Sequence, residues 1–442
     1  MSSLPPENDN NRPFSALPRR TLLGGALIAG AGLAMGSDPR RADAAPARPI
    51  EFTVWDRTDH FQTGYPAGCL IDGRGGLIIG KALKGFTYTD PHTRKKRSYD
   101  RGEWVSPLVT PRFRFTELIT SINATTPSGT WVDVAVQGLT ASGRWTRWLM
   151  LGRWTSGDGA DDIRRTSLDG QVDGLVKINT DTLMTTSGET MINYKVRVRL
   201  FRIAGTTSTP RVGLVSAVAS AIPKTTSVPT SASSGAWGKT VNVPTYSQEL
   251  HKGHYPQYDG GGEAWCSPTC TAMILDHWQR GPKASELSWV RVTPENRRQV
   301  DHAARQTFDH QYGGTGNWTF NTAYAGQQGL RSYVTRLKSL REVEGFITAG
   351  VPLVVSLSFT SAQLSGAGYG TNGHLLVIVG FTRTGDVVVN DPASHLQKSD
   401  AQVRTTYRRG QFENVWQTSS GGIAYVMAPW GHRLPAAAPN WS

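Results

Sequence analysis

The sequence predicts two folded domains of different class, an all-β sandwich or jelly roll followed by an α+β domain. Residues 50–216 carry short alternating apolar and polar runs separated by turn signals, and no long segment of helical period interrupts them. Residues 217–240 are rich in Ser, Thr, Ala, Pro and Gly and nearly free of charge, which predicts a flexible linker. Over residues 241–432, helical patterns come first and strand patterns follow, as in α+β domains.

Length and composition agree with this division and exclude several classes. The chain has 442 residues, of which 18% are charged and 38% hydrophobic, which is typical of a soluble globular protein and excludes a coiled coil. Its three cysteines are too few for a disulfide-stabilised scaffold. The formal charge is +13, but no basic helix or groove-reading motif accompanies it. We therefore expect no nucleic-acid partner and a general affinity for polyanionic surfaces.

The first 45 residues resemble a twin-arginine export signal. Arg19 and Arg20 precede an apolar run from Leu22 to Met35, and small residues around Ala45 suit a cleavage site. As a helix this run would rise only about 21 Å, less than the roughly 30 Å of a bilayer core, so we expect no transmembrane segment. An ordinary secretory signal is the alternative. Either signal predicts a secreted or cell-envelope protein from which residues 1–45 have been removed.

Individual strands of the first domain are marked by period-two patterns. Residues 194–200 alternate apolar and cationic side chains, and residues 131–137 place valines on one face. Turn signals at residues 71–76, 126–129 and 141–143 separate such runs. Six of the 14 tryptophans fall in this domain. We expect most of them to fill the sandwich core, and a face that stacks on glycans is the alternative.

The helices and strands of the second domain are predicted from the spacing of apolar residues and from the glycines and prolines that mark their ends. Gly260–Gly262 frees the backbone and Pro268 suits a first helical turn, so a helix is expected to begin at Cys266. The unpaired N–H groups and the dipole at a helix N-terminus favour a thiolate, which makes Cys266 a candidate nucleophile. The other elements expected here are helices around residues 295–307 and 319–326 and strands over 351–359, 375–381 and 387–389.

A proton-transfer partner for this thiol is found downstream. His374 stands at the mouth of the apolar strand 375–381, and Asp391 follows the strand 387–389. In an antiparallel hairpin closed near residues 382–385, His374 and Asp391 meet at the open end. A nucleophile needs a base that a third group orients, and this hairpin supplies both.

These residues resemble the C39-like peptidase family, a branch of the papain-like cysteine peptidases. The resemblance covers residues 241–430. It rests on the Val-Pro-x-Tyr-Ser-Gln run ending at Gln248, on Cys266 followed by Pro two residues later, on Gly-His at His374 and on Asn-Asp-Pro at Asp391. It implies a papain-like fold in which Cys266 is the nucleophile, His374 the general base and acid, and Asp391 the orienting group.

The same resemblance implies a residue that stabilises the oxyanion, and neighbouring residues are candidates for substrate contact. Gln248 corresponds to the oxyanion-hole glutamine. Gln257 is the competing candidate, because the nucleophile follows Gln248 by 18 positions, which is a wide spacing. Trp265, Trp318 and Gly373 are candidate substrate-binding residues beside the nucleophile, in a glycine-rich loop and beside the histidine. Trp318 serves equally well as an anchor of its loop.

A metal site is the chief chemical rival to this interpretation. His251, His254, Cys266, Cys270 and His277 are residue types that bind zinc. However, Cys270 lies one helical turn after Cys266 and points into the predicted core, and the two closely spaced histidines lie in a glycine-rich loop. We therefore expect neither a metal nor a cofactor.

The sequence thus predicts an exported, monomeric cysteine peptidase that hydrolyses a peptide bond by acyl transfer. Its expected partners are a peptide or protein substrate of the cell envelope or exterior and an anionic cell-wall polymer or glycan. The alternative is a non-catalytic wall-binding or glycan-binding protein on a papain-like scaffold.

Overall fold

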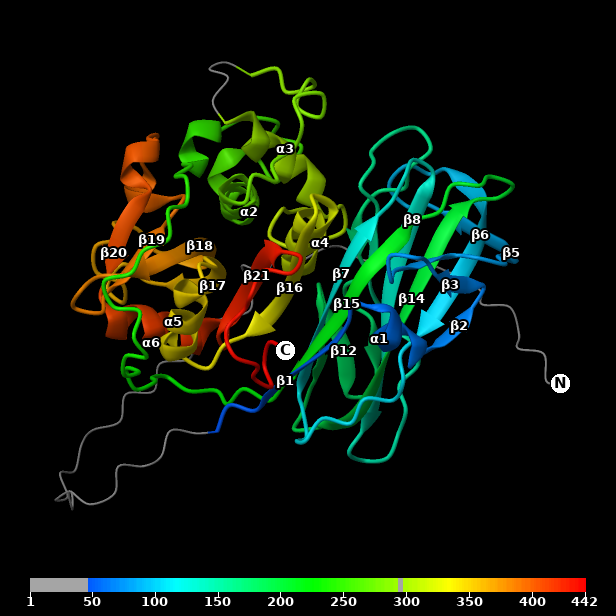
Figure 1. Cartoon of the computed structure of the whole chain (residues 1–442), viewed down its shortest axis with the longest axis horizontal. Helices are drawn as coiled ribbons and strands as arrows, with labels where there is room; N and C mark the ends of the chain where they lie inside the picture. The colour runs from blue at the N-terminus through cyan, green and yellow to red at the C-terminus, as the bar shows by residue number, and fades with distance from the viewer. Residues whose placement is uncertain (1–46, 293–296) are drawn as a thin grey trace. The chain divides into compact units, whose positions relative to one another are not determined.

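The computed structural model describes residues 47–292 and 297–442. The expected export signal, residues 1–45, lies outside the described residues. The described residues all belong to one compact unit. Within it, the expected fold class is confirmed, with an N-terminal antiparallel β-sandwich (blue to green in Figure 1) and a C-terminal α+β domain (green to red).

The N-terminal domain consists of two antiparallel sheets and one short helix. The first sheet contains β1 (Ile50–Trp55), β3 (Cys69–Ile71), β4 (Leu77–Ile79), β7 (Glu117–Thr125), β11 (Val172–Asp173), β12 (Val176–Asn179), β13 (Thr182–Thr185) and β15 (Arg211–Ser220). The second contains β2 (Tyr65–Ala67), β5 (Leu83–Thr89), β6 (Lys96–Val105), β8 (Thr130–Thr140), β9 (Leu149–Trp154), β10 (Thr166–Ser167) and β14 (Met191–Ile203). Helix α1 spans Thr58–Gln62.

Apolar side chains at alternating positions along the strands form the sandwich core. Val196 and Val198 of β14 lie opposite Val136 and Val134 of β8, and all four side chains are buried. This is the alternation that the sequence predicts for a half-buried strand. Four of the six tryptophans are also buried. Trp55, Trp104 and Trp154 lie in the main core, whereas Trp131 lies in a separate cluster with Tyr88, Tyr99 and Phe201.

The segment expected to be a flexible linker begins in a sandwich strand and then makes hydrogen bonds to the C-terminal domain. Strand β15 continues to Ser220, so the first residues of the segment belong to a sheet. Further on, the Ser234 amide and the Trp237 indole both donate to the Glu344 carboxylate. The Ser231 amide donates to Glu413. Small polar residues let the extended backbone lie close to these carboxylates, and its amides are satisfied there.

The C-terminal domain combines one antiparallel sheet with helices. The sheet has the order β16 (Leu330–Arg336), β21 (Ile423–Pro429), β17 (Leu353–Phe359), β18 (Thr371–Phe381), β19 (Val387–Asn390) and β20 (Arg404–Tyr407). The helices are η2 (Gln248–His251), η3 (Gly262–Ala264), α2 (Cys266–His277), α3 (Arg298–Thr307), α4 (Trp318–Gln327), α5 (Leu340–Thr348), η4 (Ser394–Leu396), η5 (Asp400–Gln402) and α6 (Arg409–Ser419). The sequence patterns predicted α2, α3, α4, β17, β18 and β19, and missed β16, β20, β21, α5 and α6.

The hairpin of β18 and β19 has the predicted antiparallel pairing but begins earlier than expected. Val377 lies opposite Asn390, so Asp391 continues toward the end where His374 lies. His374 is not at the mouth of the strand, because β18 begins at Thr371 and pairs with β17 there, placing His374 opposite Leu357. Strand β17 therefore holds the histidine backbone on one side, whereas the pairing of β18 with β19 begins at Val377.

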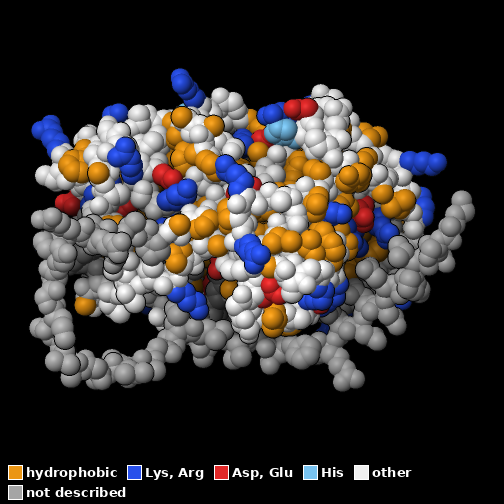
Figure 2. All heavy atoms as spheres, turned by 90° about the horizontal axis from the view of Figure 1, so that it is seen from below, with side chains coloured by type: hydrophobic (Ala, Val, Ile, Leu, Met, Phe, Trp, Pro, Cys, Tyr) orange, Lys and Arg blue, Asp and Glu red, His pale blue; other side chains and the backbone are white. Residues whose placement is uncertain are grey.

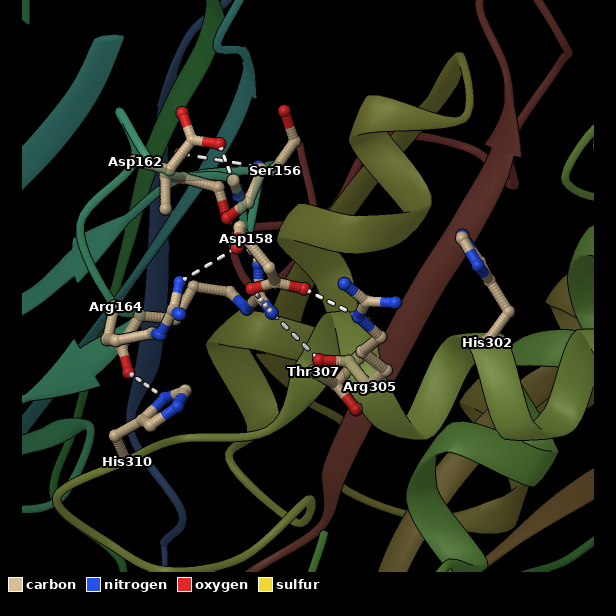
Figure 3. Close-up of polar contacts among 12 residues, drawn as sticks. Ser156, Asp158, Asp162, Arg164, His302, Arg305, Thr307 and His310 are labelled. Atoms are coloured by element: carbon tan, nitrogen blue, oxygen red, sulfur yellow. Dashed lines mark hydrogen bonds and ion pairs between the residues drawn. The ribbon is translucent and has the colours of Figure 1, made fainter. Parts of the chain in front are cut away.

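The two domains share buried polar contacts. The Asn123 side chain on β7 donates to the Ser332 carbonyl of β16 at 2.7 Å and accepts from the Ser332 amide at 3.0 Å. At another contact, Asp158 of the sandwich forms an ion pair with Arg305 of α3 at 2.9 Å, and the two side chains point toward each other in Figure 3. The fully buried Arg165 also binds Asp158 and donates to the Arg305 carbonyl.

The last residues of the chain join both domains. The Phe52 amide of β1 donates to the Pro439 carbonyl at 2.7 Å. The Tyr333 hydroxyl of β16 donates to the Trp441 carbonyl at 3.0 Å, and the Trp441 side chain is buried. The C-terminal segment thus lies against strands from opposite halves of the sequence.

Among the described residues, no helix has the length and apolarity that crossing a membrane requires. On the face that Figure 2 shows, Lys and Arg side chains are dispersed among hydrophobic and uncharged groups.

Replacing Asn123 tests the contact between β7 and β16. Asn123→Ala leaves the buried amide and carbonyl of Ser332 without their partners, so we expect the free energy of unfolding to fall by about 2–4 kcal/mol. Chemical denaturation followed by tryptophan fluorescence measures this change. Asn193→Ala, at a partly exposed position of β14, is the matched control with an expected change within about 0.5 kcal/mol. Equal destabilisation by the two variants would show that the contact contributes nothing.

Candidate active site

Cys266 is the first residue of α2, at the helix end where N–H groups have no intrahelical partner. It is half-buried, whereas the residues that follow it in the helix are buried. The preceding glycines allow a close approach of two segments. A Cβ on Gly262 would lie 2.2 Å from the His251 carbonyl carbon and 2.4 Å from the Gln248 carbonyl oxygen, so only glycine fits.

His374 is buried between Asp391 and Cys266. Its Nε2 lies 2.8 Å from Asp391 Oδ1, and its side chain is only 4% exposed. The imidazole also forms a side-chain hydrogen bond with Cys266. The hairpin register and the start of α2 therefore bring the three predicted residues together in the order thiol, imidazole, carboxylate.

The Asp391 carboxylate is fully buried and bound by several donors. The Tyr407 hydroxyl of β20 donates to Oδ2 at 2.6 Å, and the Tyr369 hydroxyl donates to the same oxygen at 2.8 Å. The Ala393 amide donates to Oδ1 at 3.0 Å. Sequence analysis missed both tyrosines, because neither has a spacing or motif that separates it from an ordinary core aromatic residue.

Burial and charge oppose each other in this cluster. Burial alone would raise the pKa of Asp391, but His374 and then the hydroxyls of Tyr407 and Tyr369 lower it. Burial alone would lower the pKa of His374, but Asp391 and then Cys266 outweigh it and raise this pKa to about 10. The pair is therefore held as carboxylate and imidazolium. The pKa values of Tyr369 and Tyr407 are raised by burial and by Asp391, so both phenols keep their protons.

Gln248 lies at the start of η2, beside both halves of the candidate site. Its backbone N–H donates to the Pro392 carbonyl at 2.9 Å, next to Asp391. Its side-chain Nε2 donates to the Glu263 carbonyl at 2.8 Å, near Cys266. The side chain is buried, and Oε1 has no hydrogen-bond partner among the described residues. Gln257, the competing candidate, is exposed and hydrogen-bonds with Tyr258.

The three residues expected to contact substrate have different surroundings. Trp265 is fully buried and its indole donates to the Tyr258 carbonyl, so it packs in the core and is not available for substrate contact. The Trp318 amide donates to Asp181 of the sandwich, which anchors the start of α4 to that domain. Gly373 is exposed beside His374, and a Cβ there would meet open space.

The five residues named above as possible zinc ligands do not come together as one site. Cys270 donates to the Leu375 carbonyl at 3.3 Å, and His277 Nδ1 lies 2.9 Å from the Asn242 carbonyl oxygen. Burial raises the pKa of the Cys270 thiol well above its ordinary value. Burial and then Glu103 raise the pKa of Cys69 to about 12, so both thiols remain protonated and inert near neutral pH.

Comparison with known proteins finds a matching family for each of the two domains. Residues 51–220 match the family described as "Peptidase C39 N-terminal domain", and residues 240–423 match the "Peptidase_C39 like family". The chain therefore contains a C39-like domain, as its sequence resemblance implied. No curated protein matches the chain.

Solved structures give weaker similarities. A Bacillus anthracis protein assigned to the C39-like peptidases is 17% identical, with 42% of this chain and 96% of that chain covered and a TM-score of 0.27. TmCBM61, solved in complex with β-1,4-galactotriose, is 9% identical over 38% of this chain and 87% of that chain, with a TM-score of 0.17. A structure of infectious bursal disease virus, Gt strain, is 11% identical over 42% and 36%, with a TM-score of 0.17. Scores this low do not define a function.

The charge state of His374 predicts a pH dependence of stability. Because its pKa rises from about 6.5 in the unfolded chain to about 10 in the folded protein, the stabilisation is fully present below pH 6.5 and lost as pH rises toward 10. The free energy of unfolding of the wild type should therefore fall more steeply over this window than that of His374→Gln. Chemical denaturation at a series of pH values measures the difference.

His432→Gln is the control for this measurement, because His432 is half-buried and lies 2.8 Å from the Ala349 carbonyl oxygen. Its pH profile should run parallel to that of the wild type. Parallel profiles for His374→Gln and the wild type would contradict the raised pKa of His374.

Proposed function

Because residues 240–423 form a C39-like domain, we propose that the chain is a cysteine peptidase with Cys266 as nucleophile, His374 as general base and acid, and Asp391 as the orienting group. One observation carries the proposal. The His374 imidazole is buried between Asp391, 2.8 Å away, and the half-buried thiol at the N-terminus of α2. A thiol, an imidazole and a carboxylate in this order constitute the arrangement that acyl transfer requires.

The proposed reaction has two steps. In the first, Cys266 Sγ attacks the peptide carbonyl carbon, His374 gives its proton to the leaving amine, and the C–N bond breaks to leave a thioester. In the second, His374 takes a proton from water, whose oxygen attacks the thioester carbonyl. The C–S bond then breaks, the carboxylic acid leaves and the thiolate is restored. Asp391 keeps the imidazole oriented and stabilises its charged form throughout.

Negative charge on the carbonyl oxygen requires donors. The Cys266 backbone N–H at the start of α2 is one candidate, and the Gln248 side-chain amide is the second. In the described conformation Gln248 Nε2 donates to the Glu263 carbonyl. The proposed role therefore requires this amide to turn toward the substrate. Gln257 is too exposed to provide a donor in a water-excluded site.

The substrate proposed is a peptide or protein of the cell envelope or exterior. The twin-arginine-type pattern in residues 1–45 supports export, after which that segment is removed. The formal charge of the whole chain is +13, and a basic protein is attracted to anionic wall polymers.

Wall or glycan binding by the sandwich is a second candidate function, and one observation favours it. Trp145 is 38% exposed, and the Lys195 ammonium lies 5.6 Å from its ring centroid. Two residues further along β14, Arg197 lies 4.7 Å from the ring centroid of the partly exposed Trp148. An aromatic ring stacks on a sugar and a neighbouring cation binds its acidic groups, so this pair of contacts suits an anionic glycan.

Replacing the nucleophile tests the peptidase proposal. In the chain lacking residues 1–45, Cys266→Ala should reduce the rate of peptide hydrolysis by at least about 10⁴-fold, because no other group can form the thioester. Mass spectrometry of products from a mixture of unstructured peptides measures the rate. Iodoacetamide labelling gives a second readout, since Cys266 should alkylate faster than the other thiols at neutral pH and lose this advantage in His374→Ala.

Cys69→Ala and Cys270→Ala are the matched controls, because both thiols are protonated and lie outside the triad. Both should retain hydrolysis. Unchanged hydrolysis in Cys266→Ala would exclude the proposed mechanism. Slow, His374-independent alkylation of Cys266 would do the same and would favour the binding scaffold.

Sedimentation with purified cell walls tests the second candidate. We expect the mature chain to sediment with walls at low salt, and to keep part of that binding at high salt through stacking. Trp145→Ala combined with Trp148→Ala should remove the salt-resistant part by about 10-fold or more. Trp430→Ala, an exposed tryptophan of the other domain, is the control. Binding that the double variant leaves unchanged would contradict a role for these rings.

A further inference from the structure

A second cluster of ligand-type side chains lies beside the candidate active site and takes no part in the proposed reaction. His251 Nδ1 of η2 lies 3.0 Å from Asp301 Oδ2, and His254 Nδ1 lies 3.0 Å from Asp301 Oδ1. The donor atoms of the three residues all lie within 4.8 Å of one another. We propose that His251, His254 and Asp301 bind one divalent transition-metal ion of the Zn²⁺ type.

The donor set fits this class of ion. Two imidazole nitrogens and one carboxylate oxygen are ligands that Zn²⁺ and its first-row neighbours accept, whereas Ca²⁺ and Mg²⁺ take oxygen ligands only. Zinc bonds to nitrogen and oxygen measure about 2.0–2.2 Å, so two ligands of one tetrahedral ion lie about 3.3 Å apart. The 3.0 Å separations in the cluster are close to this value.

In the described structure His251 Nδ1 donates to the acceptor-only carboxylate of Asp301, so a metal ion at Nδ1 would take the place of that proton. The side chain is completely buried, and Nε2 has no hydrogen-bond partner among the described residues. A donor to Nε2 would force the proton onto Nδ1 and prevent coordination there. Because no such donor is present in the described part of the chain, Nδ1 can coordinate while Nε2 carries the proton.

The elements that carry the ligands are held in place independently of any ion. The His254 amide donates to the His251 carbonyl in a tight turn, and Gly262 contacts the same carbonyl from the loop before α2. Helix α3, which supplies Asp301, is tied to the sandwich by the ion pair of Arg305 with Asp158 (Figure 3). His254 is 13% exposed while the other two side chains are completely buried, so an ion would enter past His254.

An ion in this position would cross-link η2 to α3. Helix η2 begins at Gln248, so the cross-link would fix the segment that lies between Pro392 and the loop before Cys266. The inferred role is structural, because the three ligands share no side chain with the triad of Cys266, His374 and Asp391. It does not depend on peptidase activity.

Calorimetric titration with Zn²⁺ tests the proposal. The mature chain carrying Cys266→Ala, which removes the reactive thiol as a competing ligand, is stripped with a chelator, dialysed and titrated. We expect one ion per chain, with an affinity that falls at least about 10–100-fold in His254→Ala and in Asp301→Asn. His277→Ala, at a histidine beside the Asn242 carbonyl, should leave the affinity unchanged. Circular dichroism establishes that each variant is folded.

Cobalt substitution identifies the ligands independently of affinity. Co²⁺ added to the stripped chain should give the visible bands of a nitrogen- and oxygen-bound ion without a thiolate charge-transfer band, and His254→Ala should remove them. Equal Zn²⁺ affinity in the parent, His254→Ala and Asp301→Asn chains would overturn the proposal. A thiolate band would also overturn it, and the three side chains would then be a hydrogen-bonded cluster only.

Discussion

The Asp391 carboxylate is a negative charge buried where water does not reach, and the geometry of the second domain follows from the need to satisfy it. A buried charge is stable only when it is paired and hydrogen-bonded. Its donors are His374 on β18, Tyr407 on β20, Tyr369 before β18, and the Ala393 amide. Several segments must therefore keep their positions relative to one carboxylate, and this constraint fixes the imidazole in front of the thiol.

The parts of the site that the sequence predicted are those encoded by local periodicity. An apolar run, a turn and a second apolar run define a hairpin, and the hairpin brings His374 and Asp391 together whatever surrounds them. Cys266 was found because glycines and a proline mark the start of a helix. Tyr407 could not be found this way, because its position beside Asp391 depends on β20 adding to the hairpin at one register. Tyr369 likewise depends on the fold of an irregular loop.

The errors have a common physical cause, which is that composition does not specify what a segment packs against. Residues 217–240 have the composition of a flexible tether, yet Glu344 accepts from the Ser234 amide and the Trp237 indole and pairs with Arg409. Trp265 adjoins the nucleophile in sequence, but the start of α2 directs its side chain into the core. In both cases the tertiary partner, absent from the local pattern, decided the outcome.

The hydrogen bond from Phe52 to Pro439 has a consequence for the order of folding. It joins the first strand of the sandwich to the last residues of the chain, and the Tyr333 contact with Trp441 does the same for β16. Contacts so far apart in sequence form slowly, since loop closure must come first. Neither contact can form until residues 439 and 441 have been synthesised and have left the ribosome. A chain that stops after residue 429 but before residue 439 therefore lacks both contacts, although it contains every described strand and helix of the two domains.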